Sequence, residues 1–287
     1  MRKKLLPVWL FVAFLGFCVL MGIRAPYKSA TAESYARAEC VVEVSSLRVL
    51  QEKNAETPLP NASTTKILTA IIVIDDCDLS ETVEIPSQAA GTEGSSIYLK
   101  AGENYTVEEL LYGLMLRSGN DAAVTLALHH SGSIEAFAQK MNEKATMLGA
   151  TDSYFVNPHG LPDKRHKTTA RDLALIAAYA MQNETFRTIV STKYYAPRGW
   201  ANKNKMLASY EGANGIKTGF TTDAGRCLVT SAERNGMTLV SVVLGCPQMY
   251  ERTAELLDSA FANYSLTQLA DSAMLPSNVG MPCVFYY

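Results

Sequence analysis

Residues 61–70 read NASTTKILTA, a stretch that places a serine and a lysine at the start of an apolar helical pattern. Ser63 and Lys66 stand three positions apart, and apolar residues then recur at helical spacing, at Ile67, Leu68, Ile71 and Ile72. A helix that begins here would carry both polar side chains on one face, about one turn apart. Its N-terminus would add unpaired N–H groups and a positive dipole, which suit a nucleophile and a developing oxyanion. Lys66 could act as the base only if burial or a neighbouring cation lowered the pKa of its amine.

Two further segments strengthen this interpretation, because the pair alone also fits a capping serine beside a surface lysine. Ser118-Gly119-Asn120 lies where one helical pattern ends and the next begins. Lys217-Thr218-Gly219 lies in a strand pattern, where Gly219 would let another backbone approach closely. In this order, the three segments correspond to the S-x-x-K, S-D-N and K-T-G signature that is typical of penicillin-binding proteins and class A β-lactamases, with Gly119 in place of the aspartate.

The chain resembles the low-molecular-mass penicillin-binding proteins, which are the serine D-alanyl-D-alanine carboxypeptidases of bacterial cell walls (peptidase S11). The resemblance runs from about Val41 to Tyr264, and Ser-Gly-Asn is the carboxypeptidase form of the second motif. It extends to four further stretches: NYTVEELL at 104–111, NPHGL at 157–161, TTARD at 168–172 and GIKTGFT at 215–221. The resemblance implies an α/β (α+β) penicillin-binding/β-lactamase-like fold, with an antiparallel sheet flanked by helices and a mostly helical lobe.

The pattern of elements independently favours a mixed α/β layer structure, because strands are predicted at both ends and helices between them. Predicted strands cover 40–44, 47–50, 215–221, 226–233 and 237–244, with Asn235-Gly236 as a hairpin turn. Predicted helices cover 63–74, 106–117 with a Thr106/Glu109 capping box, a stretch from about 121, 133–149, 169–181 and 251–264.

The resemblance also implies roles for individual residues. Ser63 would attack the peptide carbonyl, Lys66 would take its proton, and Ser118 would pass a proton to the departing D-alanine. The backbone N–H groups of Ser63 and Phe220 would bind the oxyanion, and Asn120 would orient Lys66 and the substrate amide.

The expected substrate is a peptidoglycan stem peptide that ends in D-Ala-D-Ala and lies along residues 215–221 as an added strand. Its terminal carboxylate would meet Lys217 and Thr218 beside Gly219, together with Arg252, whose distance beyond the third motif resembles that of a family carboxylate ligand. β-Lactams would act as inhibitors by acylating Ser63.

Composition adds no other partner or cofactor. The 287 residues are 48% hydrophobic and 19% charged with a net charge of −2, so nothing indicates nucleic-acid binding. The four histidines are not spaced as paired metal ligands on a helix, so neither a metal nor another cofactor is predicted. An odd number of cysteines remains after the leader, which favours free thiols over a disulfide framework.

Two alternative functions remain open. The first is a β-lactamase of the same fold. By resemblance to the class A enzymes, it would carry a Glu-x-x-x-Asn arrangement between the second and third motifs. None of the glutamates in that interval is followed by asparagine four residues later (Glu135, Glu143, Glu184, Glu211). A catalytically silent wall-binding or β-lactam-sensing module would predict a damaged motif, and all three motifs are intact.

The N-terminus predicts export. Arg2, Lys3 and Lys4 precede the uncharged run 5–23, and Ala30-Thr31-Ala32 fits a signal-peptidase site. Residues 1–32 therefore form either a cleaved signal peptide or a retained membrane anchor, and both place the remainder outside the cytoplasm. The carboxypeptidase domain is expected over 39–264. The tail 265–287 is expected to lack the family's usual C-terminal β-rich domain.

Overall fold

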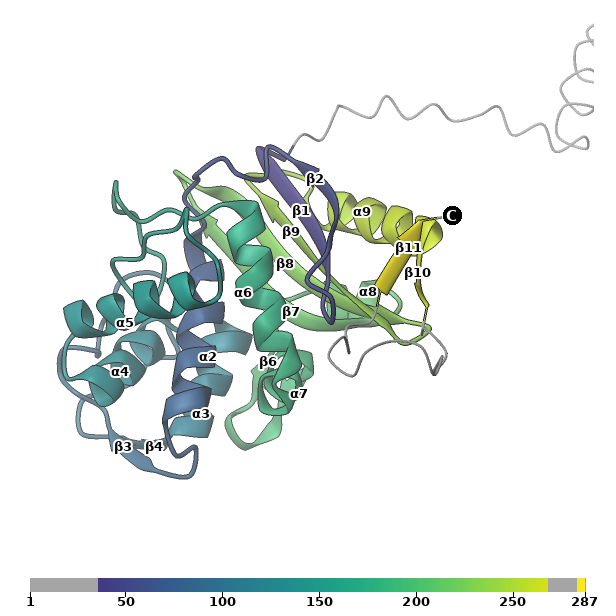
Figure 1. Cartoon of the computed structure of the whole chain (residues 1–287). Coiled ribbons are helices and arrows are strands. Elements are labelled where there is room, and N and C mark those ends of the chain that lie inside the picture. Colours follow the sequence, from purple (N-terminus) through teal and green to yellow (C-terminus); the bar gives the residue numbers. More distant parts are fainter. Residues whose placement is uncertain (1–35, 268–282, 287) are drawn as a thin grey trace, which may run out of the picture. The chain divides into compact units, whose positions relative to one another are not determined.

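The computed structural model describes residues 36–267 and 283–286. Its centre is a five-stranded antiparallel sheet in the order β2-β1-β9-β8-β7, beside which most helices gather into a separate lobe (Figure 1). The sheet strands are β1 (Ala38–Glu43), β2 (Val49–Lys53), β7 (Ala213–Thr221), β8 (Gly225–Arg234) and β9 (Met237–Leu244). Three two-stranded pairs lie outside it: β3 (Thr82–Glu84) with β4 (Asn104–Thr106), β5 (Tyr194–Tyr195) with β6 (Trp200–Ala201), and β10 (Tyr264–Thr267) with β11 (Cys283–Tyr286).

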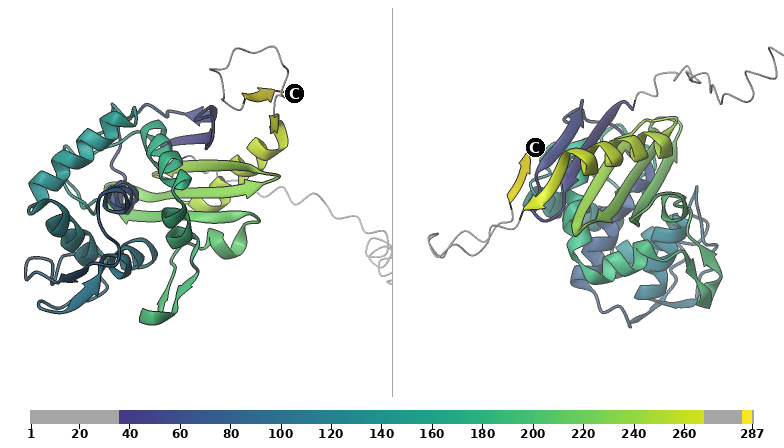
Figure 2. Two further views of the ribbon diagram at one scale, coloured as in Figure 1. Left: turned by 60° about the horizontal axis from the view of Figure 1, so that its bottom comes forward. Right: turned by 90° about the vertical axis from the view of Figure 1, so that its right-hand side faces the viewer.

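Helices cover both faces of the sheet. On one face α6 packs against β1 and β9, and on the other α9 packs against β8 and β9 (Figure 2). The helices are α2 (Lys66–Asp76), α3 (Val107–Tyr112), α4 (Asn120–Ser131), α5 (Ile134–Met147), α6 (Ala170–Gln182), α7 (Glu184–Ser191), α8 (Met206–Ser209) and α9 (Met249–Asn263). A 3-10 turn at Ala62–Thr65 precedes α2, and a π-helical turn at Gly113–Arg117 extends α3.

The alternation of side chains along the strands explains the two layers. In β8, Cys227 and Val229 belong to the core beneath α6, whereas Leu228 and Ala232 belong to the core beneath α9. Successive strand residues point to opposite faces, so a strand of continuous apolar residues supplies both cores at once. The hairpin between β8 and β9 has positive φ at both Asn235 and Gly236, as a two-residue turn of this hand requires.

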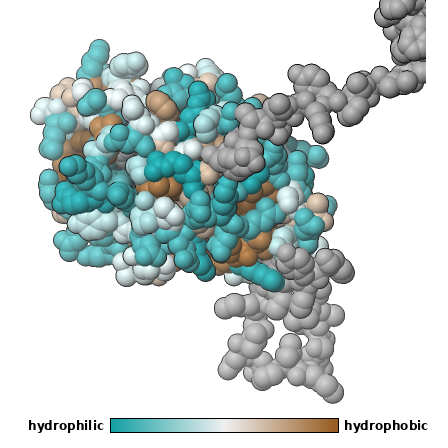
Figure 3. All heavy atoms as spheres, turned by 90° about the horizontal axis from the view of Figure 1, so that it is seen from above, coloured by the Kyte–Doolittle hydropathy of each residue, from teal (hydrophilic) through white to brown (hydrophobic). Residues whose placement is uncertain are grey.

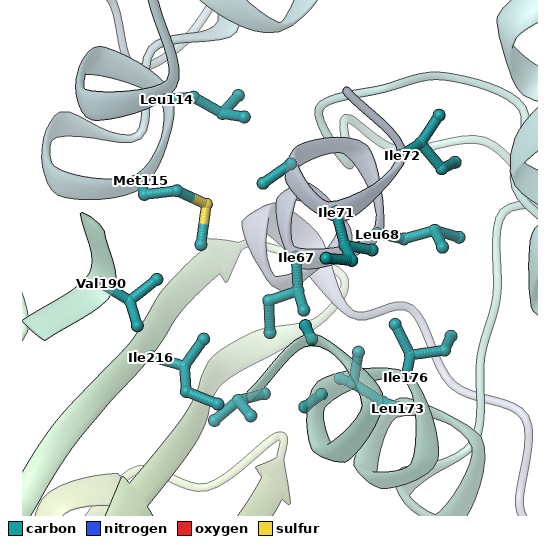
Figure 4. Packing of buried hydrophobic residues seen from close by; sticks show 14 of the residues in the cluster. Ile67, Leu68, Ile71, Ile72, Leu114, Met115, Leu173, Ile176, Val190 and Ile216 are labelled. Atoms are coloured by element: carbon teal, nitrogen blue, oxygen red, sulfur yellow. The ribbon is translucent and has the colours of Figure 1, made fainter. Parts of the chain in front are cut away.

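Helix α2 lies at the centre of the larger core. Its apolar side chains pack between Leu114 and Met115 on one side and α6 on the other, with Ile216 of β7 close to Ile67 (Figure 4). Residues 66–73 of this helix are all buried, so the amine at its N-terminus is enclosed by the protein. On the face seen from above in Figure 3, hydrophobic residues appear in small patches between hydrophilic ones.

The structure confirms most of the predicted elements. The Thr106/Glu109 capping box is present with both of its hydrogen bonds, and Thr169 caps α6. Two boundaries need correction. The predicted helix from residue 63 begins as a 3-10 turn, and the α-helix starts at Lys66. The strand predicted at 47–50 lies instead at Val49–Lys53. The helices α7 and α8 and the short strand pairs were not predicted.

The predicted domain limits 39–264 lie close to the start of β1 and the end of α9. Residues 1–32, the predicted leader, lie outside the described residues, and of the predicted tail only β10 from Ser265 and β11 are described. Within the described ranges, no helix has the length and apolar character that crossing a bilayer requires. Among the cysteines whose side chains are described, Cys40, Cys77, Cys227 and Cys246 form no disulfide, in line with the prediction.

Candidate active site

Ser63 lies on a tight turn that is held against the edge of the sheet. Ala62, just before it, has a left-handed φ of 50°, a conformation that residues other than glycine seldom adopt. The turn packs directly on β7, because a Cβ added to Gly219 would lie 3.0 Å from Ser63 N. This contact confirms that glycine is needed in the third motif for close backbone approach.

Lys66 is fully buried and its amine is surrounded by three oxygen atoms. Its Nζ lies 3.0 Å from Ser63 Oγ, 2.7 Å from Asn120 Oδ1 and 2.8 Å from the carbonyl oxygen of His159. A neutral amine has two N–H groups and one lone pair. With both N–H groups donated to Asn120 and His159, its lone pair is left for the Ser63 hydroxyl.

The electrostatic environment favours this neutral amine. Burial lowers the pKa of Lys66 well below its ordinary value, and the positive charges of Lys217 and Lys203 lower it further. Burial and Lys203 also lower the pKa of Lys217 to about 7. The negative charge of Asp121 raises the pKa of Lys66 and so opposes this shift. Its carboxylate oxygens, however, accept hydrogen bonds from the backbone N–H groups of Ile97 and Leu99.

The second motif sits at the junction between the π-helical turn and α4. Ser118 has a left-handed φ of 66° there, and the chain then enters α4 at Asn120. The amide of Asn120 can be oriented in only one way, since its Nδ2 donates to the Glu93 carbonyl at 2.6 Å while its Oδ1 accepts from Lys66. Within the described residues, Ser118 Oγ makes no hydrogen bond, so the hydroxyl is available to a substrate.

The three motifs meet at one cleft between the helical lobe and β7. The cleft has a volume of about 370 Å³ and is lined by Ser63, Ser95, Ser118, Lys203, Thr218, Gly219, Phe220, Arg226, Met249 and Tyr250. Lys66, Asn120 and Lys217 lie just behind this surface, and Lys217 Nζ donates to the Thr218 carbonyl at 2.9 Å. A larger hollow of about 850 Å³ beside α5 contains no serine or lysine of the three motifs.

A metal centre is not indicated in this part of the molecule. Among the residues that the structure describes, no cluster of histidine, cysteine or carboxylate side chains could hold a metal ion. What the cleft does bring together is a serine hydroxyl in contact with a buried lysine amine, with the basic side chains of Lys203 and Arg226 in its wall.

Comparison with known proteins agrees with this geometry. A model of the D-alanyl-D-alanine carboxypeptidases, peptidase S11, matches residues 25–248. The chain belongs to the peptidase S11 family. D-alanyl-D-alanine carboxypeptidase DacF of Bacillus subtilis is 36% identical over 244 residues, which is 80% of this chain and 63% of DacF. This S11 chain thus spans less than two thirds of the length of that relative.

Two comparisons with Streptomyces K15 cover more of the related protein. Its D-alanyl-D-alanine carboxypeptidase is 37% identical over 230 residues, which is 72% of this chain and 79% of the relative. A solved structure of a variant of the Streptomyces K15 DD-transpeptidase superposes with a TM-score of 0.75 at 34% identity, and covers 79% of this chain and 98% of that one. The fold is accordingly that of the DD-peptidases.

Arg252 is not brought to the cleft, which corrects the expectation that it binds a substrate carboxylate. Its guanidinium makes two hydrogen bonds to Glu39, of 2.6 and 2.9 Å, and a third of 2.9 Å to Glu255. Glu39 is only 4% exposed, so the guanidinium is needed to compensate a buried carboxylate. Sequence spacing could not reveal this partner, because Glu39 lies on β1, far away along the chain.

Two contributors to the S11 site were not singled out from the sequence. The first is the backbone carbonyl of His159, whose segment was noted only for its resemblance to the family. The second is Lys203, which lines the cleft and lowers the pKa of both buried lysines. A lone lysine in a loop carries no sequence signal for such a role, whereas the stretch NPHGL at 157–161 offered a partial one.

Proposed function

We propose that the protein is a serine D-Ala-D-Ala carboxypeptidase that removes the terminal D-alanine from peptidoglycan stem peptides. The observation that carries this proposal is the contact between the fully buried Lys66 amine and Ser63 Oγ, with Asn120 and His159 accepting the remaining amine protons. A nucleophile within hydrogen-bond reach of a base, with the base oriented by a third group, is the arrangement that covalent catalysis requires.

In the acylation step, Ser63 Oγ attacks the carbonyl carbon between the last two D-alanines while its proton passes to Lys66. The oxyanion would be bound by the backbone N–H groups of Ser63 and Phe220. The C–N bond then breaks, and Ser118 donates a proton to the departing amine of D-alanine. Ser118 is reprotonated from Lys66, directly or through water, with Lys217 stabilising the network electrostatically.

In the deacylation step, water attacks the ester on Ser63. Lys66 is neutral again and takes a proton from this water, and the Ser63 oxygen leaves and regains the proton. The products are the shortened peptide and free D-alanine, so no cofactor is needed to balance the reaction.

The substrate would bind along the free edge of β7. This strand ends the sheet order, and its residues Thr218, Gly219 and Phe220 line the cleft, which supports recognition as an added strand. The terminal carboxylate would meet Thr218 and Lys203, with Arg226 nearby in the same wall. These two cations replace Arg252, whose guanidinium is bound by carboxylates.

A fluorescent penicillin tests the nucleophile, because a β-lactam should acylate Ser63 and leave slowly. Wild-type protein should be labelled, and intact-mass spectrometry followed by peptide mapping should place the adduct on Ser63. The Ser63→Ala variant should not be labelled, and labelling of that variant would refute the assignment.

Release of free D-alanine from a synthetic peptide ending in D-Ala-D-Ala then separates a carboxypeptidase from a silent binding module. Rapid turnover of nitrocefin would instead indicate a β-lactamase. The combination expected is peptide hydrolysis with a long-lived penicillin adduct.

We also propose that the enzyme acts outside the cytoplasm, attached to the membrane or released. The basic residues and uncharged run within 1–32 support export, and the proposed substrate is a cell-wall polymer. The intact mass of protein isolated from cells gives the mature N-terminus and decides between cleavage and anchoring.

A further inference from the structure

His166 is a buried imidazole that the proposed mechanism does not use. It is 3% exposed, and the ring of Phe155 packs edge-to-face against it with centroids 5.4 Å apart. Its Nδ1 accepts the backbone N–H of Val156 at 3.2 Å, so the proton of the neutral ring must sit on Nε2. Nε2 lies 2.9 Å from Thr65 Oγ1 and therefore donates to that hydroxyl.

Thr65 connects this imidazole to the nucleophile turn. Its oxygen also accepts from Asn61 Nδ2 at 3.0 Å, and its own proton is donated to the Ala62 carbonyl at 2.8 Å. With both acceptor positions occupied, the hydroxyl proton can point only at Ala62. Ala62 is the residue with left-handed φ immediately before Ser63, so Thr65 supports the turn that aims the nucleophile.

The same imidazole also closes the loop that supplies an acceptor to Lys66. The Val156–His166 hydrogen bond joins the two ends of a loop whose His159 carbonyl binds Lys66 Nζ. This loop touches the nucleophile turn directly: a Cβ added to Gly160 would lie 1.9 Å from the Ala62 carbonyl oxygen. Loop and turn are therefore joined at Gly160, at Lys66 and at the His166–Thr65 contact.

We propose that His166 is a positioning residue that holds the Ser63 turn and the His159 carbonyl at a fixed separation. It touches neither substrate nor the reacting atoms. Its hydrogen bond to Thr65 locks one segment and its hydrogen bond from Val156 locks the other. Lys66 then meets Ser63 Oγ and the His159 oxygen at the same time. This inference rests on the proposed serine acyl-enzyme.

Two half-isosteres of histidine separate positioning from mere core filling. In His166→Gln the amide nitrogen can take the place of Nε2, which keeps the hydrogen-bond donor to Thr65. In His166→Asn the amide oxygen can take the place of Nδ1, which keeps only the acceptor for the Val156 N–H. The measurement is the rate constant of acylation by penicillin as a function of pH. Mass spectrometry at the end of the reaction gives the fraction of molecules that can be acylated, and the rate is normalised to that fraction. This normalisation removes any unfolded fraction.

His166→Gln should keep most of the wild-type rate constant. His166→Asn should lose at least about tenfold, because the hydrogen bond to Thr65, one of the three contacts between the nucleophile turn and the loop, is lost and the turn is held less precisely. In His166→Asn the acidic limb of the pH profile should also move to higher pH, since a loosened loop admits water to Lys66 and raises the pKa of its amine. Equal rate constants and pH profiles for the two variants, with a difference only in melting temperature, would overturn the proposal.

Thr65→Val tests whether the effect passes through the threonine hydroxyl. The Thr65→Val variant should be acylated slowly. Adding His166→Asn to it should lower the acylation rate constant little further, because both changes break the same hydrogen bond between His166 and Thr65. Fully additive losses would contradict the proposed route. A matched control is His130→Asn, which alters a hydrogen-bonded histidine that packs edge-to-face on Phe137 away from the cleft, and which should leave acylation unchanged.

The two proposals fail in different ways. A wild-type protein that penicillin does not acylate on Ser63 would refute the acyl-enzyme and, with it, any role of His166 in positioning it. A wild-type protein acylated on Ser63, together with an equally fast His166→Asn variant, would refute the positioning role alone.

Discussion

Lys66 and Arg252 are two basic side chains that lie on opposite sides of the same sheet, and the fold treats them in opposite ways. Arg252, in the layer under α9, is matched by the buried carboxylate of Glu39 and by Glu255. Lys66, at the start of α2, has only neutral oxygen atoms as hydrogen-bond partners, and two further cations lower the pKa of its amine. A paired charge stabilises the packing of two elements, whereas an unpaired amine is driven toward its neutral, basic form.

The largest effect should come from Lys66→Met, which keeps the length of the side chain but removes the base. Acylation by penicillin should slow by at least about 10³-fold, because Ser63 loses the group that takes its proton. Stability should fall by about 1–3 kcal/mol at most, because Asn120 Oδ1 and the His159 oxygen lose their donor while removal of the buried amine offsets part of that cost. Stopped-flow acylation and thermal unfolding measure the two quantities.

Lys144→Met is the matched control for that variant. Lys144 is also largely buried, but it is paired with Asp75 and contacts the Tyr179 hydroxyl. Its loss should lower stability and leave the acylation rate per folded molecule unchanged. Fast acylation by Lys66→Met would contradict the assignment of Lys66 as the base.

Arg252→Met should lower the stability of the protein without slowing acylation. Removing the guanidinium leaves Glu39 buried without its bidentate partner, which should lower the free energy of unfolding by about 2–4 kcal/mol. The acylation rate constant and the Michaelis constant for a D-Ala-D-Ala peptide should stay near their wild-type values. Chemical denaturation and steady-state kinetics of the same preparation give both numbers.

Arg171→Met provides the reference for an exposed pair, because Arg171 and its partner Glu56 are both well exposed. That variant should change stability by no more than about 1 kcal/mol. If Arg252→Met instead raised the Michaelis constant while leaving stability intact, Arg252 would be a substrate ligand after all.

The same contrast marks what could be predicted from the sequence. Local signals were sufficient for the elements that carry the site: the capping box at Thr106, the Asn235-Gly236 turn and the apolar spacing after Lys66 all describe neighbours along the chain. The three motifs could be placed in one cleft because each carries its own short pattern. Fold and nucleophile followed from these patterns together with the family resemblance.

The remaining features depend on contacts between distant segments. Arg252 was misassigned because its position after the third motif says nothing about Glu39, which reaches α9 only through the β1–β9 pairing. The His159 contribution comes from a backbone carbonyl, and any residue type supplies one. His166 and Thr65 lie 101 positions apart. No sequence period connects such positions, so only the folded structure brings them together.

The smallest effect should come from Lys203→Gln, which removes one of the positive charges that lower the pKa of Lys66 but leaves Lys66 itself in place. Lys203 lowers the pKa of Lys66 and of Lys217, so its neutralisation should raise both pKa values and move the acidic limb of the acylation profile to higher pH. Below that limb Lys66 is protonated and cannot accept the Ser63 proton, so the variant should be slower near neutral pH and should approach the wild type at alkaline pH. Binding of a carboxylate-terminated peptide should weaken by about two- to fivefold, as expected for an exposed charge. Lys205→Gln, two residues further on and also exposed, should shift neither quantity, and an unshifted limb in Lys203→Gln would leave burial and Lys217 as the causes of the lowered pKa of Lys66.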